Sequence, residues 1–491
     1  MRNNPLLMSD GYKTGHHLMY APGTTKVYSN YTCRSIKYMP EGADEVVVFG
    51  IQYVMKYINT LWQENFFALA KEEVCGEAKK YLSQYLGAEY NVKHFEALHD
   101  IGYLPIEVKA LKEGFRITSG VPLFTIQNTK PEQFWLTNFL ETLISTLVWK
   151  PVHSASLAYA YKKVLEKYAK ETDEKNMWFV DFQAHDFSFR GMQSPEAAIS
   201  SGMGFASVFK GSDTIPILKA ITHYYGDIES IYSVNATEHS VMCSGSKEGE
   251  KQTFQRLLKT FPTGILSIVS DTWDLWKVCT EILPSLKGEI LARNGKLTIR
   301  PDSGDPVNII CGLNTSPEFE SGALYLGEEP ELKGLIELLW DVFGGTVNEQ
   351  GYKVLDYHIG AIYGDSITLE RAKQICQRLK DKGFASTNIV FGVGSYSLGY
   401  ATRDNQGGAV KSTYVEINGE GMEIFKDPIT DDGTKKSAKG LLQVYADSGV
   451  LKVKDCCTKE EEKQGLLKTI FKEGKFYNRT SLAEVREFIK L

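Results

Sequence analysis

"KLTIRPDSGDP" (residues 296–306) is a short apolar strand that ends abruptly in an arginine and a carboxylate. Residues 297–299 have the composition of a buried strand, and Pro301 restricts the turn that follows them. Arg300 and Asp302 stand on either side of that proline. A single ending of this kind could be an ordinary loop, so its meaning depends on whether the pattern recurs.

The pattern recurs along the middle of the chain. Six short apolar runs each finish in polar residues and are followed by a helical segment. Strands that alternate with helices indicate parallel βα units, and polar groups gathered at the strands' carboxyl ends are typical of an α/β barrel. The runs with their endings are MWFVDF-QAHDFSFRG (177–191), ESIYSVNA-TEHS (229–240), GILSIV-SDTWD (264–274), KLTI-RPDSG (296–304), YHIGAI-YGDS (357–366) and NIVF-GVGS (388–395).

The flanking parts of the chain have a different character. Residues 105–129 alternate like paired strands, residues 131–170 have helical spacing, and the chain after about residue 405 is rich in glycine, lysine and turn residues. We therefore predict an α/β fold, with an irregular TIM-like α/β barrel beside an α+β domain built from both chain ends. The predicted parts are residues 1–175 and 405–491 for the α+β domain and residues 176–404 for the barrel.

Length and composition set the broad class. A chain of 491 residues exceeds the size at which one core usually stops growing, so two domains are expected. A formal net charge of -6 argues against a nucleic-acid-binding protein, while a small anionic substrate needs only a local group of arginines. The eight cysteines form no CxxC pair, and no apolar run has the length of a signal peptide or a membrane span. These features predict a cytoplasmic enzyme with no membrane partner.

The polar residues at the predicted strand ends suit a phosphorylated ligand. Arginine binds phosphate through two parallel hydrogen bonds, and glycine lets the backbone N–H groups approach an anion closely. Carboxylates suit ribose hydroxyls or a Mg²⁺ ion carried by a polyphosphate. A sugar phosphate or a nucleotide is therefore the expected ligand class. The pooled candidates are His185, Asp186, Arg190, Asp213, Glu238, His239, Asp271, Arg300, Asp302, Asp365, Gly364, Gly392 and Gly394.

Each candidate taken alone has a structural explanation. "FGVGSYSLG" lacks the GxGxxG spacing of a dinucleotide-binding loop, and a turn without a ligand explains it equally well. His185 alone fits a hydrogen-bonded structural histidine better than a functional one. Glu238 beside His239 is a motif of low specificity, and no spacing of histidines or cysteines indicates a zinc site. The evidence comes from the set as a whole.

At this point the set resembles a known family. The order and spacing of twelve stretches are similar to those of the nicotinamide phosphoribosyltransferases, dimeric type II phosphoribosyltransferases, over nearly the whole chain. The stretches are SDGYKTGHH, YTCR, HDFSFRG, FKGSDT, YSVNATEHS, VSDTWD, IRPDSGDP, YGDS, FGVGS, TRD, VKSTYV and FKDP. The resemblance implies joining of nicotinamide to 5-phosphoribosyl 1-pyrophosphate, with nicotinamide mononucleotide and pyrophosphate as products in NAD salvage.

The resemblance also implies a pocket for the pyridine ring. Phe187 would stack on one face of the ring, and Tyr12 of a second subunit would cover the other. Asp213 would accept a hydrogen bond from the carboxamide NH₂, with Asp10 and Ser267 nearby. Since two chains would supply this pocket, an obligate homodimer with shared active sites is expected.

The same resemblance assigns the charged groups of the ribose pyrophosphate. Arg190 and Arg300 would bind pyrophosphate, while Asp302 and Gly364 would contact the ribose diol beside Asp365. Gly394 and Ser395 would cradle the 5′-phosphate, although the family often has glycine where Ser395 stands. The residues that a second subunit would add are Arg403 at the 5′-phosphate and Arg34 and Lys411 at the pyrophosphate, and Lys426 and Lys435 align less firmly.

His239 resembles the histidine that ATP phosphorylates in an auxiliary step that drives synthesis forward. A neutral imidazole accepts a phosphoryl group when a carboxylate orients its other nitrogen, and Asp271 is preferred over Glu238 for this task. ATP is then a co-substrate. Mg²⁺ would neutralise the pyrophosphate leaving group, with Asp271 as a candidate ligand.

Three other functions compete with this interpretation. Nicotinate phosphoribosyltransferase has the same fold, and Asp213 argues against it because two carboxylates would repel each other. A barrel lyase or isomerase acting on another sugar phosphate would rank equally without the resemblance, because fold alone does not decide function. A non-catalytic binding protein would not need the complete set of site residues.

Overall fold

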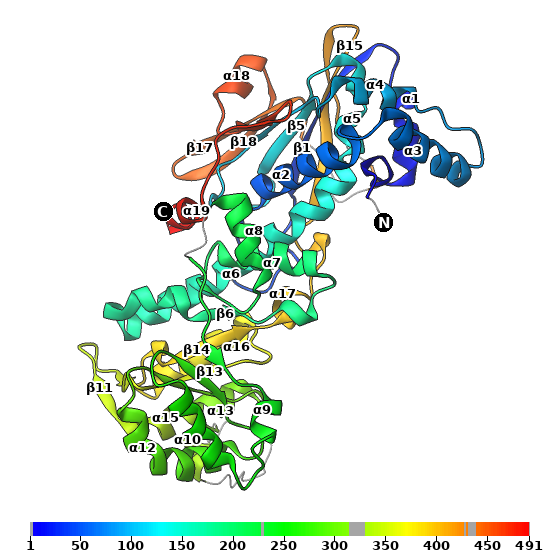
Figure 1. Ribbon diagram of the computed structural model, residues 1–491. Coiled ribbons are helices and arrows are strands. Elements are labelled where there is room, and N and C mark those ends of the chain that lie inside the picture. The colour runs from blue at the N-terminus through cyan, green and yellow to red at the C-terminus, as the bar shows by residue number, and fades with distance from the viewer. Residues whose placement is uncertain (1–2, 227–229, 314–328, 427–428, 431–437, 491) are drawn as a thin grey trace.

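The protein contains two large sheets of different kinds. The computed structural model describes residues 3–226, 230–313, 329–426, 429–430 and 438–490. One sheet has seven parallel strands, and the other has seven strands in antiparallel pairs. Figure 1 shows the antiparallel sheet above the parallel one, with both chain ends on the upper side. The fold is therefore mixed α/β.

The parallel sheet contains five of the six predicted strands, together with two short strands, Ala184–Asp186 and Gly211–Ser212. β9, β10 and β13 are buried along their lengths, apart from half-buried Arg300 at the end of β10. Such near-continuous apolar strands are typical of a parallel sheet that is covered on both faces. The strand order is β7 (Gly211–Ser212), β6 (Ala184–Asp186), β14 (Ile389–Val393), β13 (Ile359–Tyr363), β10 (Leu297–Arg300), β9 (Leu266–Val269) and β8 (Asn235–Ala236).

The two edges of this sheet approach each other. Tyr232, which precedes β8, forms a parallel bridge with Gly211 of β7. Its carbonyl accepts a hydrogen bond from the N–H of Ser212 at 3.0 Å, and its own N–H donates to the carbonyl of Lys210 at 2.8 Å. The sheet is thus curved into a half-barrel with a bridge between its edges.

The antiparallel sheet combines strands from both ends of the chain. β1 pairs with β15 on one side and with β5 on the other, so the N-terminal and C-terminal parts share one sheet. The order is β16 (Glu420–Glu423), β15 (Gly408–Ile417), β1 (Thr24–Cys33), β5 (Pro122–Asn128), β3 (Ile106–Ala110), β19 (Lys468–Lys472) and β20 (Lys475–Phe476). Three two-stranded pairs are β2 (Val46–Val47) with β4 (Arg116–Ile117), β11 (Gly345–Val347) with β12 (Lys353–Leu355), and β17 (Leu441–Asp447) with β18 (Val450–Cys457).

Helices surround the two sheets. In the N-terminal part they are α1 (His16–Met19), α2 (Ile51–Trp62), α3 (Lys71–Leu86), α4 (Lys93–Ile101), α5 (Leu136–Phe139) and α6 (Glu141–Thr172). Around the parallel sheet they are α7 (Pro195–Ala206), α8 (Pro216–Tyr225), α9 (His239–Cys243), α10 (Glu250–Thr260), α11 (Leu275–Lys277), α12 (Leu283–Leu291), α13 (Pro306–Cys311), α14 (Glu329–Lys333), α15 (Leu335–Phe343), α16 (Leu369–Asp381) and α17 (Ser395–Leu398). The C-terminal part adds α18 (Lys459–Gln464) and α19 (Leu482–Lys490).

The long helix α6 connects the two sheets. It runs between them in Figure 1 and contacts β2 and β15 of the upper part as well as α7 and α16 of the lower part. Most of the buried apolar residues form one large cluster that continues from Leu6 to Ile489 across both parts, and a small second cluster contains Tyr28, Leu441, Leu442 and Cys457. Because α6 is packed on both sides, the two sheets share one core. The predicted boundaries at residues 175/176 and 404/405 stay predictions.

One predicted strand is wrong. Residues 177–182 (MWFVDF) belong to a 3-10 helix, Glu174–Phe182, and the strand β6 begins only at Ala184. Only Val180 of this helix is buried, and Trp178 is exposed. A short apolar run does not by itself distinguish a strand from a helical turn, so the packing of neighbouring elements decided its conformation. The predicted pairing within residues 105–129 is confirmed by β3 and β5.

Candidate active site

The predicted strand ends meet around a glycine at the end of β13. A Cβ atom on Gly364 would lie 2.8 Å from Asp302 Oδ1, 3.5 Å from Phe187 Cε2 and 3.7 Å from Arg300 Cδ. A Cβ atom on Gly392 would lie only 2.4 Å from Phe187 Cδ2. The absence of a side chain at both glycines therefore lets the Phe187 ring lie against the ends of β13 and β14. An aromatic ring, a guanidinium and a carboxylate converge on one spot.

Phe187 lies beside a histidine–aspartate contact. Its backbone N–H donates to the carbonyl of Val393 at 3.0 Å, and its ring centroid is 5.5 Å from that of His185. His185 Nε2 lies 3.5 Å from Asp213 Oδ1, which also accepts a hydrogen bond from Ser233 Oγ at 2.5 Å. The carboxylate of Asp213 is therefore held near the ring, where a substituent of a stacked ligand would meet it.

Asp213 is an anion in this environment. Burial acts to raise its pKa, but hydrogen bonds from His185 and Ser233 and the charge of Arg300 outweigh burial and hold the pKa of this carboxyl below its usual value. An ionised carboxylate accepts hydrogen bonds and donates none. The position therefore favours a ligand group with N–H donors, such as a carboxamide, over a second carboxylate.

Arg300 has a free donor at the site. One NH₂ group donates to the carbonyl of Thr237 at 2.6 Å, and that bond orients the guanidinium. Its buried Nε atom has no hydrogen-bond partner within the described part of the chain. A buried donor without a partner costs free energy unless a ligand oxygen satisfies it. The arrangement suits an anionic oxygen of a ligand.

Asp271 fixes the turn after Arg300 through two hydrogen bonds. Asp271 Oδ2 accepts from the N–H of Asp302 at 2.8 Å and from Ser303 Oγ at 2.5 Å, and Tyr363 OH donates to the Ser303 carbonyl at 2.8 Å. Burial raises the pKa of Asp302, and the negative charges of Asp271 and Asp365 act in the same direction against Arg300. The side chains of Arg300 and Asp302 are thereby set at a defined separation.

His239 stands at the edge of this group with its side chain 48% exposed. Its Nδ1 atom lies 3.1 Å from Thr272 Oγ1, and its Nε2 atom lies 4.0 Å from Asp302 Oδ2. Asp271, the expected orienting carboxylate, binds the 302–303 turn through Oδ2, and Thr272 makes the contact at His239 Nδ1. The orienting role of Asp271 stays a prediction. Glu238, the alternative, accepts from Ser240 Oγ.

The acidic residues fit a magnesium ion that a substrate brings with it. Asp271 Oδ1 is buried and has no hydrogen-bond partner among the described residues, and Asp302 and Asp365 carry nearby negative charge. Mg²⁺ prefers carboxylate oxygens and usually keeps ligands from water and substrate phosphates. The described residues contain no cluster of three or more histidine, cysteine, aspartate or glutamate side chains that could hold a metal.

The predicted phosphate loop lies beside the arginine of the first strand ending. A Cβ atom on Gly191 would lie 2.0 Å from Ser395 Oγ, so the 3-10 helix that carries exposed Arg190 touches the start of α17. A Cβ atom on Gly394 would meet nothing within 4 Å. The space that a side chain at Gly394 would fill is therefore open, and Ser395, where the family often has glycine, touches the turn that carries Arg190.

The residues expected to serve a second subunit form a separate group on the antiparallel sheet. Arg34 at the end of β1 donates from Nε to the carbonyl of Gly407 at 3.0 Å. Lys411 on β15 has a lowered pKa, mainly through burial, with the charges of Arg34, Lys426 and Arg403 adding to it. Lys435 lies outside the described residues. An anion bound among these positively charged side chains would reduce their mutual repulsion.

Tyr12 and Asp10 complete the second group. Tyr12 is 67% exposed, and Asp10 accepts a hydrogen bond from Thr142 Oγ1 at 2.6 Å, near the start of α6. Within one chain Asp10 therefore lies beside Tyr12 at the start of α6, and its expected place near Asp213 in a shared pocket stays a prediction. Ser267 does lie in the parallel sheet, on β9, and its buried Oγ has no partner within the described residues. Each chain therefore carries two groups of site residues.

Several residues that organise the first group were not predicted. Thr237 binds Arg300, Thr272 binds His239, and Ser303 binds Asp271. All three lie inside the polar strand endings quoted from the sequence, but nothing in their type or spacing marked them. The described helices include none long and apolar enough to cross a membrane.

Two family models match the chain. Residues 182–475 match the nicotinate phosphoribosyltransferase (NAPRTase) family, and residues 4–108 match the N-terminal domain of nicotinamide phosphoribosyltransferase. The first match contains the parallel sheet and the strand-end residues. The second contains Asp10, Tyr12 and Arg34.

Relatives with a known activity are similar over almost the whole chain. The nicotinamide phosphoribosyltransferase of Acinetobacter baylyi is 45% identical, covering 99% of this chain and 97% of the relative. That of Mycoplasma pneumoniae is 35% identical, covering 90% of this chain and 97% of the relative. Human nicotinic acid phosphoribosyltransferase superposes with a TM-score of 0.56 at 16% identity, covering 99% of this chain and 93% of the human chain. That similarity shows a shared fold.

Proposed function

The chain belongs to the nicotinamide phosphoribosyltransferases of the nicotinate phosphoribosyltransferase (NAPRTase) family, and we propose that the strand-end group around Gly364 is its catalytic site. The reaction of NAD salvage joins nicotinamide to 5-phosphoribosyl 1-pyrophosphate and yields nicotinamide mononucleotide and pyrophosphate. The single observation that carries the assignment is the convergence of Phe187, Arg300 and Asp302 on Gly364. At this place Phe187 can stack on a planar ring, Arg300 can bind an anion and Asp302 can bind a sugar diol.

Each part of the substrates has a place in this proposal. The pyridine ring stacks on Phe187, and its carboxamide NH₂ donates to Asp213, with Ser267 nearby. The ribose hydroxyls bind Asp302 at Gly364, beside Asp365. The phosphates are bound by Arg190 and Arg300 at the pyrophosphate and by Gly394 and Ser395 at the 5′-phosphate. The closeness of Gly191 and Ser395 supports this division because it places Arg190 next to the loop.

The chemical step needs no proton transfer. The bond between the anomeric carbon and the pyrophosphate oxygen breaks, and its electron pair leaves with the pyrophosphate. The pyridine nitrogen lone pair forms the new bond to that carbon, so the product ring becomes a cation. Arg300 stabilises the charge that develops on the leaving group, and Asp302 and Asp213 stabilise the cationic ribose and ring.

Mg²⁺ and ATP complete the proposal. Asp271 Oδ1 and Asp302 would hold a Mg²⁺ ion that neutralises charge on the pyrophosphate. His239 would accept the γ-phosphoryl group of ATP through Nε2 when its Nδ1–H donates to Thr272, and ADP would leave. The phosphohistidine would then stand beside Asp302, close to the departing pyrophosphate, which couples ATP use to synthesis.

A homodimer with shared sites is the proposed assembly. Among the residues assigned to the first group only Phe187 offers an aromatic face, whereas the second group contains exposed Tyr12 and the cations Arg34, Arg403 and Lys411. A second copy of the chain would bring these residues to the first group. The bridge between the sheet edges supports a closed, irregular TIM-like barrel, and eight unpaired cysteines fit the reducing cytoplasm.

The assay that tests the proposal follows both products. Purified protein is incubated with nicotinamide, 5-phosphoribosyl 1-pyrophosphate and Mg²⁺, with and without ATP. Nicotinamide mononucleotide and pyrophosphate should form in equal amounts, and ATP should accelerate synthesis. Replacing Asp302 by asparagine should lower the rate sharply. If the Asp302→Asn variant forms mononucleotide at the wild-type rate, the strand-end group around Gly364 is not the catalytic site.

A further inference from the structure

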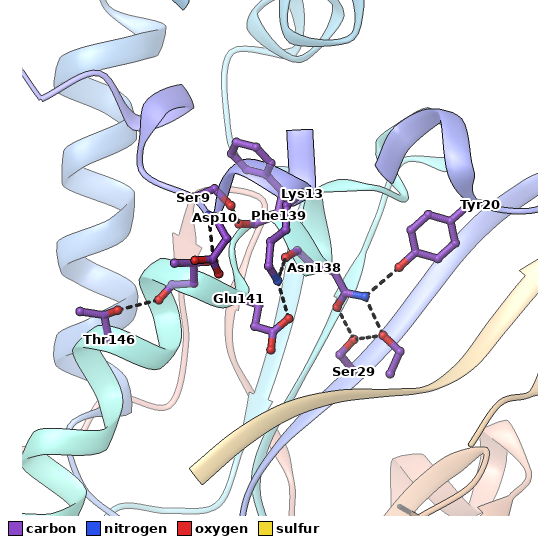
Figure 2. A network of polar contacts seen from close by, with 11 residues as sticks. Ser9, Asp10, Lys13, Tyr20, Ser29, Asn138, Phe139, Glu141 and Thr146 are labelled. Carbon is purple, nitrogen blue, oxygen red and sulfur yellow. Dashed lines mark hydrogen bonds and ion pairs between the residues drawn. The ribbon is translucent and has the colours of Figure 1, made fainter. Parts of the chain in front are cut away.

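Three residues, Ser9, Asp10 and Lys13, fasten the segment that carries Tyr12 to the junction between α5 and α6. Ser9 Oγ donates to the carbonyl of Phe139 at 2.9 Å. Thr142 Oγ1 donates to Asp10 Oδ2 at 2.6 Å and lies 3.3 Å from the Asp10 backbone N–H. Figure 2 shows these contacts together with those of the neighbouring lysine. The backbone on the N-terminal side of Tyr12 is therefore held against the helix.

Lys13 is the third of these residues and the only buried one among them. Its Nζ atom donates to the carbonyl of Asn138 at 2.8 Å and forms an ion pair with Glu141 Oε2 at 2.5 Å. The Lys13 side chain is 2% exposed and that of Glu141 is 26% exposed. Tyr12, the adjacent residue, projects outward, and Lys13 Nζ lies 5.7 Å from the centre of its ring. Lys13 is therefore buried and held by two partners, while the adjacent Tyr12 faces solvent.

The acceptor Asn138 is itself part of a network that reaches the sheet. Asn138 Nδ2 donates to Tyr20 OH and to Ser412 Oγ, both at 2.7 Å, and Ser29 Oγ donates to Asn138 Oδ1 at 2.9 Å. Ser29 lies on β1 and Ser412 on β15, next to Lys411. Figure 2 follows this network from Lys13 to Tyr20. The Tyr12 segment and the strand of Lys411 are thus joined as one rigid unit.

Stability alone does not explain this partly buried Lys–Glu pair, in which the lysine is 2% exposed. Burying two charges costs desolvation energy that their attraction roughly offsets, and apolar replacements of both partners are often neutral for stability. Such a pair does fix one geometry, because an unpaired charge at this depth is strongly disfavoured. The pair therefore restricts where the backbone at residue 12 can lie.

We propose that Lys13, paired with Glu141, is a positioning residue that holds Tyr12 ready to cover the nicotinamide ring in the site of a second copy of this chain. The inference rests on the proposed role of Tyr12. A preorganised aromatic face binds a planar ligand without the loss of conformational entropy that a mobile loop would suffer. Lys13 touches no substrate and acts only through its neighbour.

The test compares Lys13→Met with Tyr12→Ala in the full-length enzyme. Tyr12→Ala should raise the KM for nicotinamide by about tenfold, the value of one aromatic contact. Lys13→Met should raise the same KM by a similar factor and leave the KM for 5-phosphoribosyl 1-pyrophosphate within about twofold. Adding Lys13→Met to Tyr12→Ala should change the nicotinamide KM by less than about twofold, since both act through one ring.

A matched control separates positioning from general destabilisation. Lys109 on β3 also forms a largely buried pair with a glutamate, Glu462 of α18, at 2.6 Å, outside both groups of site residues. Lys109→Met should lower the melting temperature without changing the nicotinamide KM. If Lys13→Met does not fold, Glu141→Gln and Lys13→Arg provide the same comparison, with Lys13→Arg restoring most of the affinity because it keeps the charge.

The outcomes distinguish two failures. An unchanged nicotinamide KM in Tyr12→Ala would remove Tyr12 from the site and with it part of the proposed function. A raised KM in Tyr12→Ala with an unchanged KM in Lys13→Met or Glu141→Gln would overturn the positioning role alone. Additive effects in the double variant would also overturn it, because Lys13 would then act independently of Tyr12.

Discussion

At the scale of single residues, Asp213 is placed to decide which ring substituent is accepted. It is held as an anion by His185 and Ser233 and lies beside the ring of Phe187. We expect Asp213→Asn to lower the preference for nicotinamide over nicotinate by about tenfold or more, because it removes repulsion between two carboxylates. Competition kinetics with both substrates measures the ratio of kcat/KM.

Asp302→Asn is the control for this change. In the proposed function Asp302 binds the ribose, which both reactions share, so its loss should slow both reactions to the same extent. Equal kcat/KM ratios in the wild-type protein and in Asp213→Asn would show that another group recognises the carboxamide.

His239 allows a second prediction at this scale. His239→Ala should abolish ATP consumption and leave slow mononucleotide synthesis, because the phosphoryl acceptor is lost while Arg300 and Asp302 stay in place. Release of ADP and formation of mononucleotide are measured in parallel. His358, which pairs with Asp356 at 2.7 Å outside the site, is the matched control. ATP hydrolysis that survives in His239→Ala would rule out the phosphohistidine.

At the scale of elements, the end of β14 controls the position of the stacking ring. Gly392→Ala would place a methyl group 2.4 Å from Phe187 Cδ2, so the ring must move. We expect the nicotinamide KM to rise by about tenfold and the unfolding free energy to fall by about 1–3 kcal/mol. Gly288→Ala on α12, where the added Cβ meets nothing within 4 Å, is the control. Substrate kinetics and denaturant unfolding give the two values, and unaltered kinetics would contradict the stacking role.

The helix α6 carries a buried histidine that links stability to pH. Burial, aided by the charge of Lys150, lowers the pKa of His153 to about 3. In the unfolded chain the imidazole takes up a proton below about pH 6.5, whereas the native state keeps it neutral. The unfolded state thus binds more protons, and the contribution of His153 to stability is lost as pH falls from about 6.5 towards 3.

His153→Leu should therefore flatten the acid side of the stability curve. The difference in slope between wild type and variant should reach about 1.4 kcal/mol per pH unit below pH 6. Urea unfolding from pH 7 to pH 4 provides the measurement, with His223→Leu at an exposed position of α8 as control. Parallel curves for wild type and His153→Leu would mean that His153 is solvated in the native state.

Two apolar runs of the sequence, predicted alike as strands, have different structures. The run at residues 388–391 became β14, but the equally apolar run at 177–182 became a 3-10 helix. Asp181 in that helix pairs with Lys162 of α6 and with Lys210. These contacts join residues distant in the sequence, so no local pattern could reveal them.

At the scale of the whole molecule, the two groups of site residues make a complementation experiment possible. Tyr12→Ala damages only the group on the antiparallel sheet, and Asp302→Asn damages only the strand-end group. In a mixed dimer one site would combine the intact strand-end group of the first chain with the intact Tyr12 of the second. We expect the mixture, after subunit exchange, to recover up to about a quarter of wild-type activity.

Sedimentation and the two unmixed variants are the controls. Sedimentation across a dilution series, together with turnover, reports whether activity follows the dimer. Assayed at a nicotinamide concentration below the wild-type KM, each variant alone should stay weakly active at any protein concentration. A mixture no more active than its components, or full turnover by a monomer, would contradict shared sites.

The sequence by itself determined the βα series, the polar strand endings and the charged residues they carry, because strand and helix periodicity and turn residues act over a few neighbouring positions. It also marked Arg300 and Asp302 as a pair, since one proline separates them. Only the tertiary structure decided that Gly364 and Gly392 make room for Phe187, that Asp271 fixes a turn while Thr272 holds His239, and that Lys13 supports Tyr12. Those contacts depend on the packing of segments far apart in the chain, and packing is settled by the whole core at once.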